Sequence, residues 1–399
     1  MAETLASGSA TRFDRVEQVK VKYRVDESLR VLHRVWSGHR SWLVAARMTP
    51  GGRSAALYSR GRRLETPADG PLSLGHHADS GTVFWTFPND RRLRAGQALD
   101  GQAPVVRALF PTTAPSVHIQ AYTPERCVTA RLDEAGTRRA VAYAKVYADG
   151  SGIAAARMLD ALGAAAARQG AGLRVPRVLA CDEERGLLLV SPVDGRQMTD
   201  LAPSMLPVAF SRLGTALGCL HDLPAPGLPP FRRLTLGAIG TAADLIARVR
   251  PDAEPALGRL RARLHGLAPR AGRMPAVCLH GDVNSKNWMV DDRSAGLIDF
   301  DQASRGPAAC DLAGVLAGLR FRTVVGDWTQ RFESTLADAF LEGYARVRPL
   351  PAPAALAWHT GAALLVERAL RAVSRVRRDA LIHLPQILDE SRAWTERAQ

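Results

Sequence analysis

The first hundred residues alternate apolar and polar positions in short runs that turn residues separate. The strand candidates are Val19–Val35, Ser41–Met48 and Val83–Phe87, with Gly51-Gly52, Pro67–Gly75 and Pro88-Asn89-Asp90 between or after them. Short alternating runs bounded by Gly, Pro, Asn and Asp favour strands joined by tight turns. This part of the chain is therefore predicted to be rich in β-structure.

A similar pattern recurs further along the chain. Two segments share a Tyr, then a turn with an acidic residue, then a strand that contains Arg. They are Val21–Arg34 and Ile119–Arg131, and each precedes another strand, Trp42–Met48 and Val141–Tyr147 respectively. The alignment, which needs a gap, puts Arg47 opposite Lys145. Either the N-terminal region is a diverged copy of the β-rich unit that follows it, or two β-meanders resemble each other by chance.

Helical periodicity dominates the rest of the chain. A helix is predicted over Ser151–Gln169, strands over Val175–Ala180 and Leu187–Val190, and a break over Ser191–Gly195. Further helices are predicted over Leu206–His221, Ala238–Leu267, Thr329–Arg346, Ala354–Val376 and Leu384–Arg397. This order predicts an α+β chain with a β-rich region at 1–105, a β-rich lobe with one helix at 106–192, and a helical lobe at 193–399. A two-lobed chain is expected to bind its ligand in a cleft at the hinge.

Composition narrows the class of protein. A length of 399 residues suggests two or three domains. We find no run of about 18 apolar residues and no leader with an apolar core, so neither a membrane span nor a signal peptide is predicted. The five cysteines are scattered and lack CxxC spacing, which favours reduced thiols in a cytoplasm.

Net charge is +14, which alone would suggest a nucleic-acid partner. Arg supplies most of this charge, spread along the chain without a basic block or interleaved aromatics, so no nucleic-acid surface is predicted. Lys occurs only at Lys20, Lys22, Lys145 and Lys286. Where Lys does appear, its site can require a compact ammonium instead of a guanidinium fork.

The candidate chemistry lies in Cys278–Val290, CLHGDVNSKNWMV, where a polar loop separates two apolar segments. If Trp288–Val290 and Gly296–Ile298 pair as a hairpin, Asn287 and Asp299 meet at its open end. One amide oxygen and one carboxylate oxygen are suitable ligands for Mg²⁺. This ion usually retains several water ligands and is also coordinated by the phosphates of the substrate. Asp282 could then accept a proton from a hydroxyl that attacks a γ-phosphate. The structural alternative is that these residues cap turns.

HGDVNSKN resembles the HGDxxxxN catalytic loop of the aminoglycoside phosphotransferase and choline kinase-like family, within the protein kinase-like superfamily. IDFD resembles its magnesium-binding segment, and Cys310–Ala313, CDLA, resembles the stretch that follows. The resemblance runs from about Val117 to the C-terminus. It implies a bilobal protein kinase-like fold, ATP and Mg²⁺ as cofactors, Asp282 as catalytic base, and Asn287 and Asp299 as metal ligands.

The resemblance also implies nucleotide contacts. Lys145 would grip the α- and β-phosphates, and Lys286 would neutralise the transferring group or simply face solvent. The hinge would offer backbone groups to adenine at Leu189, Val190, Ser191 and Val193. The pattern departs from the family because the helix after Lys145 lacks Glu and has only Asp160 as an acid. GxGxxG is also missing, so the turn Tyr122–Arg126 would have to cover the phosphates.

Supporting roles are expected nearby. His280 would hold the loop by packing and hydrogen bonds, His221 would be a satisfied helix-end histidine, and Asp301 would assist the metal or cap a turn. Asp311 would cap its helix and brace the loop. Acids of the helical lobe could pair with an amine-bearing substrate; these are Asp327, Glu333, Asp338, Glu342 and Glu367.

The sequence thus predicts a cytoplasmic kinase that phosphorylates a hydroxyl of a small molecule, with no nucleic-acid or membrane partner and an undetermined oligomeric state. The acceptor could be an aminoglycoside, an amino sugar, a sugar, an amino alcohol or a natural-product intermediate, in antibiotic resistance or biosynthesis. The alternative is a nucleotide-binding pseudokinase scaffold, which the missing helix Glu and the extra N-terminal region favour.

Overall fold

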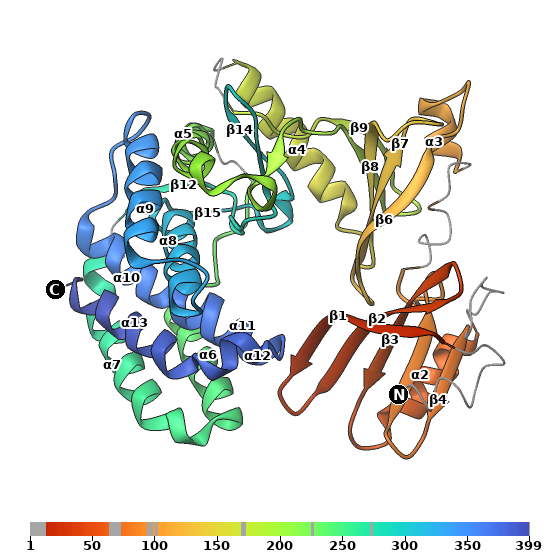
Figure 1. Cartoon of the computed structure of the whole chain (residues 1–399), viewed down its shortest axis with the longest axis horizontal. Coiled ribbons are helices and arrows are strands. Elements are labelled where there is room, and N and C mark those ends of the chain that lie inside the picture. The colour runs from red at the N-terminus through yellow and green to blue at the C-terminus, as the bar shows by residue number, and fades with distance from the viewer. Residues whose placement is uncertain are drawn as a thin grey trace. The chain divides into compact units, whose positions relative to one another are not determined.

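A computed structural model describes residues 13–63, 73–93, 99, 103–168, 173–224, 227–271 and 274–398. The chain forms two compact units. The first comprises residues 1–157 and 177–192, and the second residues 158–176 and 193–399. Figure 1 shows β-sheets in the first unit and a mainly helical second unit, so the predicted α+β class is confirmed. Each unit is described by itself below.

The first sheet of the first unit contains β1 to β5, drawn in red and orange in Figure 1. Its strands are β1 (Arg15–Arg24), β2 (Ser28–Ser37), β3 (Arg40–Met48), β4 (Leu74–His77) and β5 (Thr82–Thr86). They pair antiparallel in the order β1-β2-β3-β5-β4. Helix α2 (Arg53–Arg62) follows β3 and was not predicted, because its Ser, Gly and Arg content gives it no marked apolar face. Most of the predicted turn Pro67–Gly75 lies outside the described residues.

The second sheet has the same strand order as the first. Its strands are β6 (Ser116–Thr123), β7 (Cys127–Asp133), β8 (Ala140–Tyr147), β9 (Val178–Asp182) and β10 (Leu187–Val190). They run β6-β7-β8-β10-β9, with helix α4 (Gly152–Arg168) between β8 and β9 just as α2 lies between β3 and β4. A short helix, α3 (Pro104–Leu109), precedes the sheet. The last residue of the helix predicted over Ser151–Gln169 lies outside the described residues.

The two sheets place Arg47 and Lys145 at equivalent positions. Arg47 pairs with Arg30, two residues after the start of β2, and Lys145 pairs with Thr129, two residues after the start of β7. The preceding hairpin turns each hold an acidic residue in the left-handed region, Asp26 at φ 58° and Glu125 at φ 60°.

One apolar core joins the two sheets. Side chains from the first sheet, such as Leu32 and Trp85, belong to the same buried cluster as Val128 and Ala144 of the second. The Trp85 indole donates to the Tyr122 hydroxyl at 2.8 Å, and that hydroxyl donates to Asp90 at 2.7 Å. Since burial removes these groups from water, the network satisfies polar atoms that would otherwise destabilise the interface.

Helices form most of the second unit. They are α5 (Leu206–Asp222), α6 (Leu236–Val249), α7 (Glu254–Ala271), α8 (Ala309–Val324), α9 (Gln330–Ala345), α10 (Pro353–Ala363), α11 (Leu370–Ser374), α12 (Arg378–Ile382) and α13 (Leu384–Glu396). The prediction of a single helix over Ala238–Leu267 was wrong, because Pro251 starts a short 3₁₀ turn that separates α6 from α7. A π-helical segment, Leu364–Ala369, joins α10 to α11.

Two small sheets interrupt these helices. They contain β11 (Arg196–Gln197), β12 (Ala276–Leu279), β13 (Trp288–Val290), β14 (Ala295–Leu297) and β15 (Ser304–Pro307). The pairing is β11-β13-β14 in one and β12-β15 in the other. Among the helices described, none has the length and apolar character needed to cross a bilayer.

Candidate active site

The candidate loop joins β12 to β13 at the centre of the second unit. The predicted hairpin forms, because β13 and β14 pair antiparallel with Trp288 opposite Leu297. The pairing continues one step beyond the strands, where the Ile298 amide donates to the Asn287 carbonyl at 2.9 Å. Asn287 and Asp299 therefore stand at the same open end of the hairpin. Asp299 has left-handed backbone angles, φ 66° and ψ 62°.

Asp311 holds the start of the loop. Its buried carboxylate accepts the backbone N–H of His280 at 2.7 Å and that of Gly281 at 2.9 Å. His221 Nε2 donates to the same carboxylate at 3.3 Å, while its Nδ1 lies 2.9 Å from the Tyr344 hydroxyl. The predicted brace is present, and His221 is the satisfied helix-end histidine expected. The predicted cap is wrong, since Asp311 is the third residue of α8 and Ala308 stands at the N-cap.

These contacts shift the titration of Asp311. Burial alone would raise the pKa of its carboxyl group. The hydrogen bond and charge of His221, with the backbone donors, outweigh burial and hold that pKa below its ordinary value. The brace is therefore ionised at neutral pH.

His280 supports the loop by hydrogen bonds and packing, as the sequence predicts. Its Nε2 donates to the Ile298 carbonyl at 3.0 Å, and its Nδ1 accepts the Asp282 N–H at 3.3 Å. These partners assign the neutral tautomer with the proton on Nε2, because a carbonyl can only accept. The ring also packs on Phe300, with 4.7 Å between centroids.

Asp282 lies among cations. Its Oδ1 accepts from Arg371 at 3.0 Å and from Arg233 at 3.3 Å, and Asn284 Nδ2 donates to Oδ2 at 3.2 Å. Burial pushes the pKa of Asp282 upward, but the charges of Arg371 and Arg233 outweigh it and lower that pKa. The carboxylate is thus ionised and held in one orientation.

Asn287 is buried and tied to the loop backbone. Its Nδ2 donates to the Asp282 carbonyl at 3.0 Å, which turns the amide oxygen the other way. The amide oxygen is then available to a hard cation at the hairpin end that also carries Asp299. Lys286 belongs to the same loop and is exposed, and its carbonyl accepts from Gln197 at 3.4 Å.

The predicted nucleotide contacts lie in the other unit, apart from Val193 and Lys286. Lys145 is half-buried near the centre of its sheet, opposite Leu188, with Nζ 5.2 Å from the Tyr147 ring centroid. Leu189 and Val190 end β10, Ser191 follows it directly, and the second part of the second unit starts at Val193. The Ser191 N–H already donates to the Arg177 carbonyl at 2.8 Å. Asp160 is exposed on α4.

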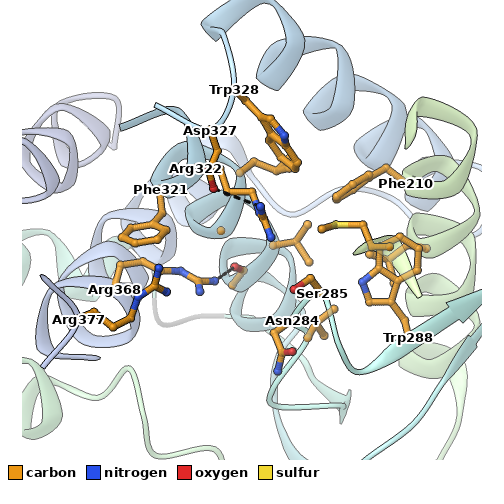
Figure 2. Close-up of a pocket in the computed structure, with 17 residues that line it drawn as sticks. Phe210, Asn284, Ser285, Trp288, Phe321, Arg322, Asp327, Trp328, Arg368 and Arg377 are labelled. Atoms are coloured by element: carbon orange, nitrogen blue, oxygen red, sulfur yellow. Dashed lines mark hydrogen bonds and ion pairs between the residues drawn. The ribbon is translucent and has the colours of Figure 1, made fainter. Parts of the chain in front are cut away.

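A cavity of about 290 Å³ opens beside the loop, within the second unit. Figure 2 shows Asn284 and Ser285 on one side of it, Phe210 and Trp288 on another, and Arg368 and Arg377 facing them across the space. The charged residues of the lining are the three arginines Arg322, Arg368 and Arg377 and one carboxylate, Asp327. Burial lowers the pKa of Arg368 to about 10, so the group stays cationic at neutral pH.

Three of the acids considered for an amine-bearing substrate are paired with arginine. Asp327 bonds Arg322 at 3.3 Å, Glu333 bonds Arg320 at 3.1 Å, and Glu367 lies 3.6 Å from Arg233. Glu333 is buried away from the cavity lining.

Sequence reasoning missed Arg233, Arg371 and Asn284. Two of these are arginines in a chain rich in arginine, far from the loop in sequence, and no local pattern distinguishes them. Asn284 lies inside the quoted loop, and its Asx spacing, two residues after Asp282 and two before Lys286, was the one local signal available.

Comparison with known proteins agrees with this geometry. The model of the phosphotransferase enzyme family known as APH matches residues 131–389. A segment of 151 residues is 30% identical to an N-acetylmuramate/N-acetylglucosamine kinase of Pseudomonas aeruginosa, covering 36% of this chain and 44% of that protein. Another, of 146 residues, is 32% identical to a homoserine kinase of Rhodopseudomonas palustris, covering 35% and 43%. The chain thus spans less than half the length of either relative.

Solved structures agree on the fold. The crystal structure of aminoglycoside phosphotransferase APH(4)-Ia aligns with a TM-score of 0.50 at 15% identity, over 75% of this chain and 99% of that one. The likeness at this identity concerns the fold, which is protein kinase-like. Because the family model covers well over half of the chain, including the whole loop and the hairpin, the chain belongs to the phosphotransferase enzyme family.

Proposed function

We propose that the protein is an ATP-dependent kinase that transfers a phosphoryl group to a hydroxyl of a small molecule. The observation that carries the proposal is the loop geometry. The Asp311 brace and the β13–β14 hairpin hold Asp282, Asn287 and Asp299 on one short, rigid segment. Phosphoryl transfer depends mainly on positioning and charge, which a braced loop supplies. A cytoplasmic location, where ATP is available, is part of this proposal.

Asp282 is the proposed base. The acceptor hydroxyl would give its proton to the Asp282 carboxylate while its oxygen bonds to the γ-phosphorus and the bond to the departing ADP oxygen breaks. An ionised carboxylate can accept this proton, and Arg371 keeps it ionised and oriented. A base fixed within hydrogen-bond reach typically contributes about 10²–10⁴-fold to rate.

The residues present fit a bound Mg²⁺. Asn287 and Asp299 would hold it with one amide and one carboxylate oxygen, a set that leaves sites for water and phosphate. When bound, the ion would neutralise charge on the phosphates. Lys145 and Lys286 would add cationic contacts to the nucleotide. The hinge would contact adenine through its backbone from Leu189 to Val193, except for the Ser191 N–H, which Arg177 already uses.

The cavity beside Asn284 is the proposed acceptor site. Its aromatic side chains offer apolar faces, and its arginines outnumber its one carboxylate. This lining favours a neutral or anionic hydroxylated acceptor over a polycationic aminoglycoside. One relative is named for N-acetylmuramate, which carries a carboxylate, and for the neutral sugar N-acetylglucosamine. The other is named for homoserine, which carries both a carboxylate and an amine. An aminoglycoside acceptor and a role in antibiotic resistance form the less favoured version of the proposal.

Competition among acceptors tests this proposal. ADP release would be measured with a panel of hydroxylated compounds matched in size: neutral sugars, sugar or amino acids with a carboxylate, and aminoglycosides. We expect the neutral and acidic members to be turned over with the higher kcat/KM. Turnover confined to the aminoglycosides would overturn the assignment of the cavity.

We also propose that the first sheet is a diverged copy of the second, with the chain organised as 1–105, 106–192 and 193–399. The shared strand order, the helix in the same place, and the equivalent register of Arg47 and Lys145 support it. The chain passes from the first compact unit to the second between Pro192 and Val193, and the first unit contains the first two of these segments except residues 158–176.

A further inference from the structure

A second, larger cavity lies far from the candidate loop in sequence. It has a volume of about 480 Å³ and lies wholly within the first unit, between the first sheet and the turn that joins β6 to β7. Cationic side chains dominate its lining, namely Lys20, Lys22, Arg24, Arg30, Arg47, Arg91, Arg92 and Arg126. Two carboxylates, Glu125 and Asp149, accompany these eight cations, so the lining carries six formal positive charges in excess.

Glu125 shows how an anionic group is held in this cavity. Its carboxylate is 1% exposed and bonds Arg47 at 2.6 Å, Arg30 at 3.0 Å and Arg91 at 2.5 Å. Three guanidinium groups therefore share one carboxylate. The carboxylate of Glu125 thus occupies part of the cavity, in a position that the anionic group of a ligand could also take.

Cationic groups are crowded around Arg30. Of the lining cations, Arg24 also pairs with Glu27 at 3.4 Å, and Lys20 donates to the Thr123 hydroxyl at 2.7 Å. Burial lowers the pKa of Arg30, and the neighbouring Arg47, Arg24 and Arg91 lower it further, against the opposing charge of Glu125. Crowded like charges of this kind are destabilising unless further anions bind among them. The excess charge thus favours an external ligand with several negative groups.

The turn that carries Glu125 is rigidly held. Asp90 accepts the Glu125 N–H at 2.6 Å and also binds the Tyr122 hydroxyl. Since this anchor uses the backbone of Glu125 and not its side chain, the cavity wall would persist if the carboxylate were replaced.

Lysine usage points to the same place. The chain has four lysines among 53 Lys and Arg residues, and two of them, Lys20 and Lys22, line this cavity. The others are Lys145 and Lys286. A lysine binds phosphate as a compact point charge, while arginine adds a bidentate fork, and this cavity contains both.

The residue of the first sheet that corresponds to Lys145 also lines this cavity. Arg47 has the same strand register as Lys145, and it faces the cavity. Among the described residues of the lining, none is aromatic, so a nucleobase would find no stacking surface. Recognition would therefore act on phosphate groups.

We propose that this cavity binds a polyphosphate anion, a chain of two or three phosphate groups, through cations of the first sheet and not through Lys145. The turn Tyr122–Arg126, expected to cover the phosphates of ATP, contributes Thr123 to Arg126 to the wall of this cavity. The phosphate chain could be inorganic or the tail of a nucleotide. Inorganic tripolyphosphate is the direct probe of the shared chemistry.

Tripolyphosphate binding would be measured by calorimetry on the full chain, without Mg²⁺ and at 0.15 M salt. The chain carries Lys145→Ala, so that the proposed nucleotide lysine does not contribute to the binding measured. We expect one tripolyphosphate per chain. Adding Lys20→Ala and Lys22→Ala should weaken binding at least tenfold. The control pair Arg60→Ala and Arg62→Ala removes the same charge from exposed positions on α2, outside the lining, and should change the affinity less than twofold.

Glu125→Gln provides a test in the opposite direction. It removes the competing carboxylate and keeps its size, so tripolyphosphate should bind several-fold tighter. ATP binding no tighter than tripolyphosphate would identify the phosphate chain alone as the ligand, and tighter ATP binding would assign the site to nucleotides. Absence of binding at millimolar tripolyphosphate, or equal losses in the lysine pair and the control pair, would overturn the proposal. Neither result bears on turnover at Asp282.

Discussion

The charge state of Asp282 depends on two arginines that the sequence did not single out. Arg371 and Arg233 both contact Oδ1, and their charges lower the pKa of a carboxyl group that burial alone would raise. A base with a lowered pKa stays ready to accept a proton over a wider range of pH. If Asp282 is the base, as proposed, these arginines set the acid limit of the reaction.

Arg371→Gln should move that limit. Without this charge the pKa of Asp282 rises, so the acid limb of the kcat/KM profile should shift to higher pH, with kcat/KM about tenfold lower from lost orientation. The profile of Arg378→Gln, an exposed arginine of α12, should match wild type. An unshifted acid limb in Arg371→Gln would show that Asp282 does not control it.

Gly281 is required by the shape of the loop. Its φ is 78°, and a Cβ there would overlap the Gln302 carbonyl oxygen. Gly281→Ala should therefore destabilise the fold by about 3 kcal/mol or more, measured by urea unfolding. Gly258→Ala, at an open position on α7, should stabilise it by about 0.5–1 kcal/mol. Equal effects of the two substitutions would contradict the strained loop.

At the scale of elements, a buried carboxylate ties α8 to the loop between β12 and β13. Asp311 accepts two loop N–H groups and one from His221 of α5, so it joins three elements. Hydrogen bonds to a buried charge contribute more than neutral ones, and their loss leaves unpaired donors.

Asp311→Asn should lower the free energy of unfolding at pH 7 by about 3 kcal/mol, because a buried partner is removed. The folded pKa of Asp311 lies below the ordinary 3.8, so its contribution is complete above that value and is lost as the pH falls through the folded pKa. Wild type should thus lose stability more steeply than the variant below about pH 4, as urea unfolding across pH would measure. Parallel curves would argue against the brace.

Sequence patterns predicted those elements whose signal is local. The β13–β14 hairpin and Leu187–Val190 were found from alternation and turn residues. The break at Pro251 was missed because the apolar spacing continues across it. Arg233 and Arg371 could not be found, since they reach Asp282 from positions 49 and 89 residues away and only tertiary folding brings them together.

At the scale of the molecule, the two units divide the proposed chemistry. The second unit holds the proposed base, the proposed metal ligands and the proposed acceptor cavity, and the first holds Lys145 and most of the expected hinge. The helix after Lys145 lacks Glu, which had suggested a pseudokinase scaffold. The intact, braced loop favours catalysis over that alternative.

Turnover by Asp282→Asn tests the central claim most directly. Phosphoryl transfer from ATP to the best acceptor of the panel would be measured beside ATP affinity, for wild type and variant. Loss of the base should lower kcat about 10²–10⁴-fold while ATP still binds with similar affinity. A variant as active as wild type, or a wild type that binds ATP but turns over no acceptor, would contradict the account.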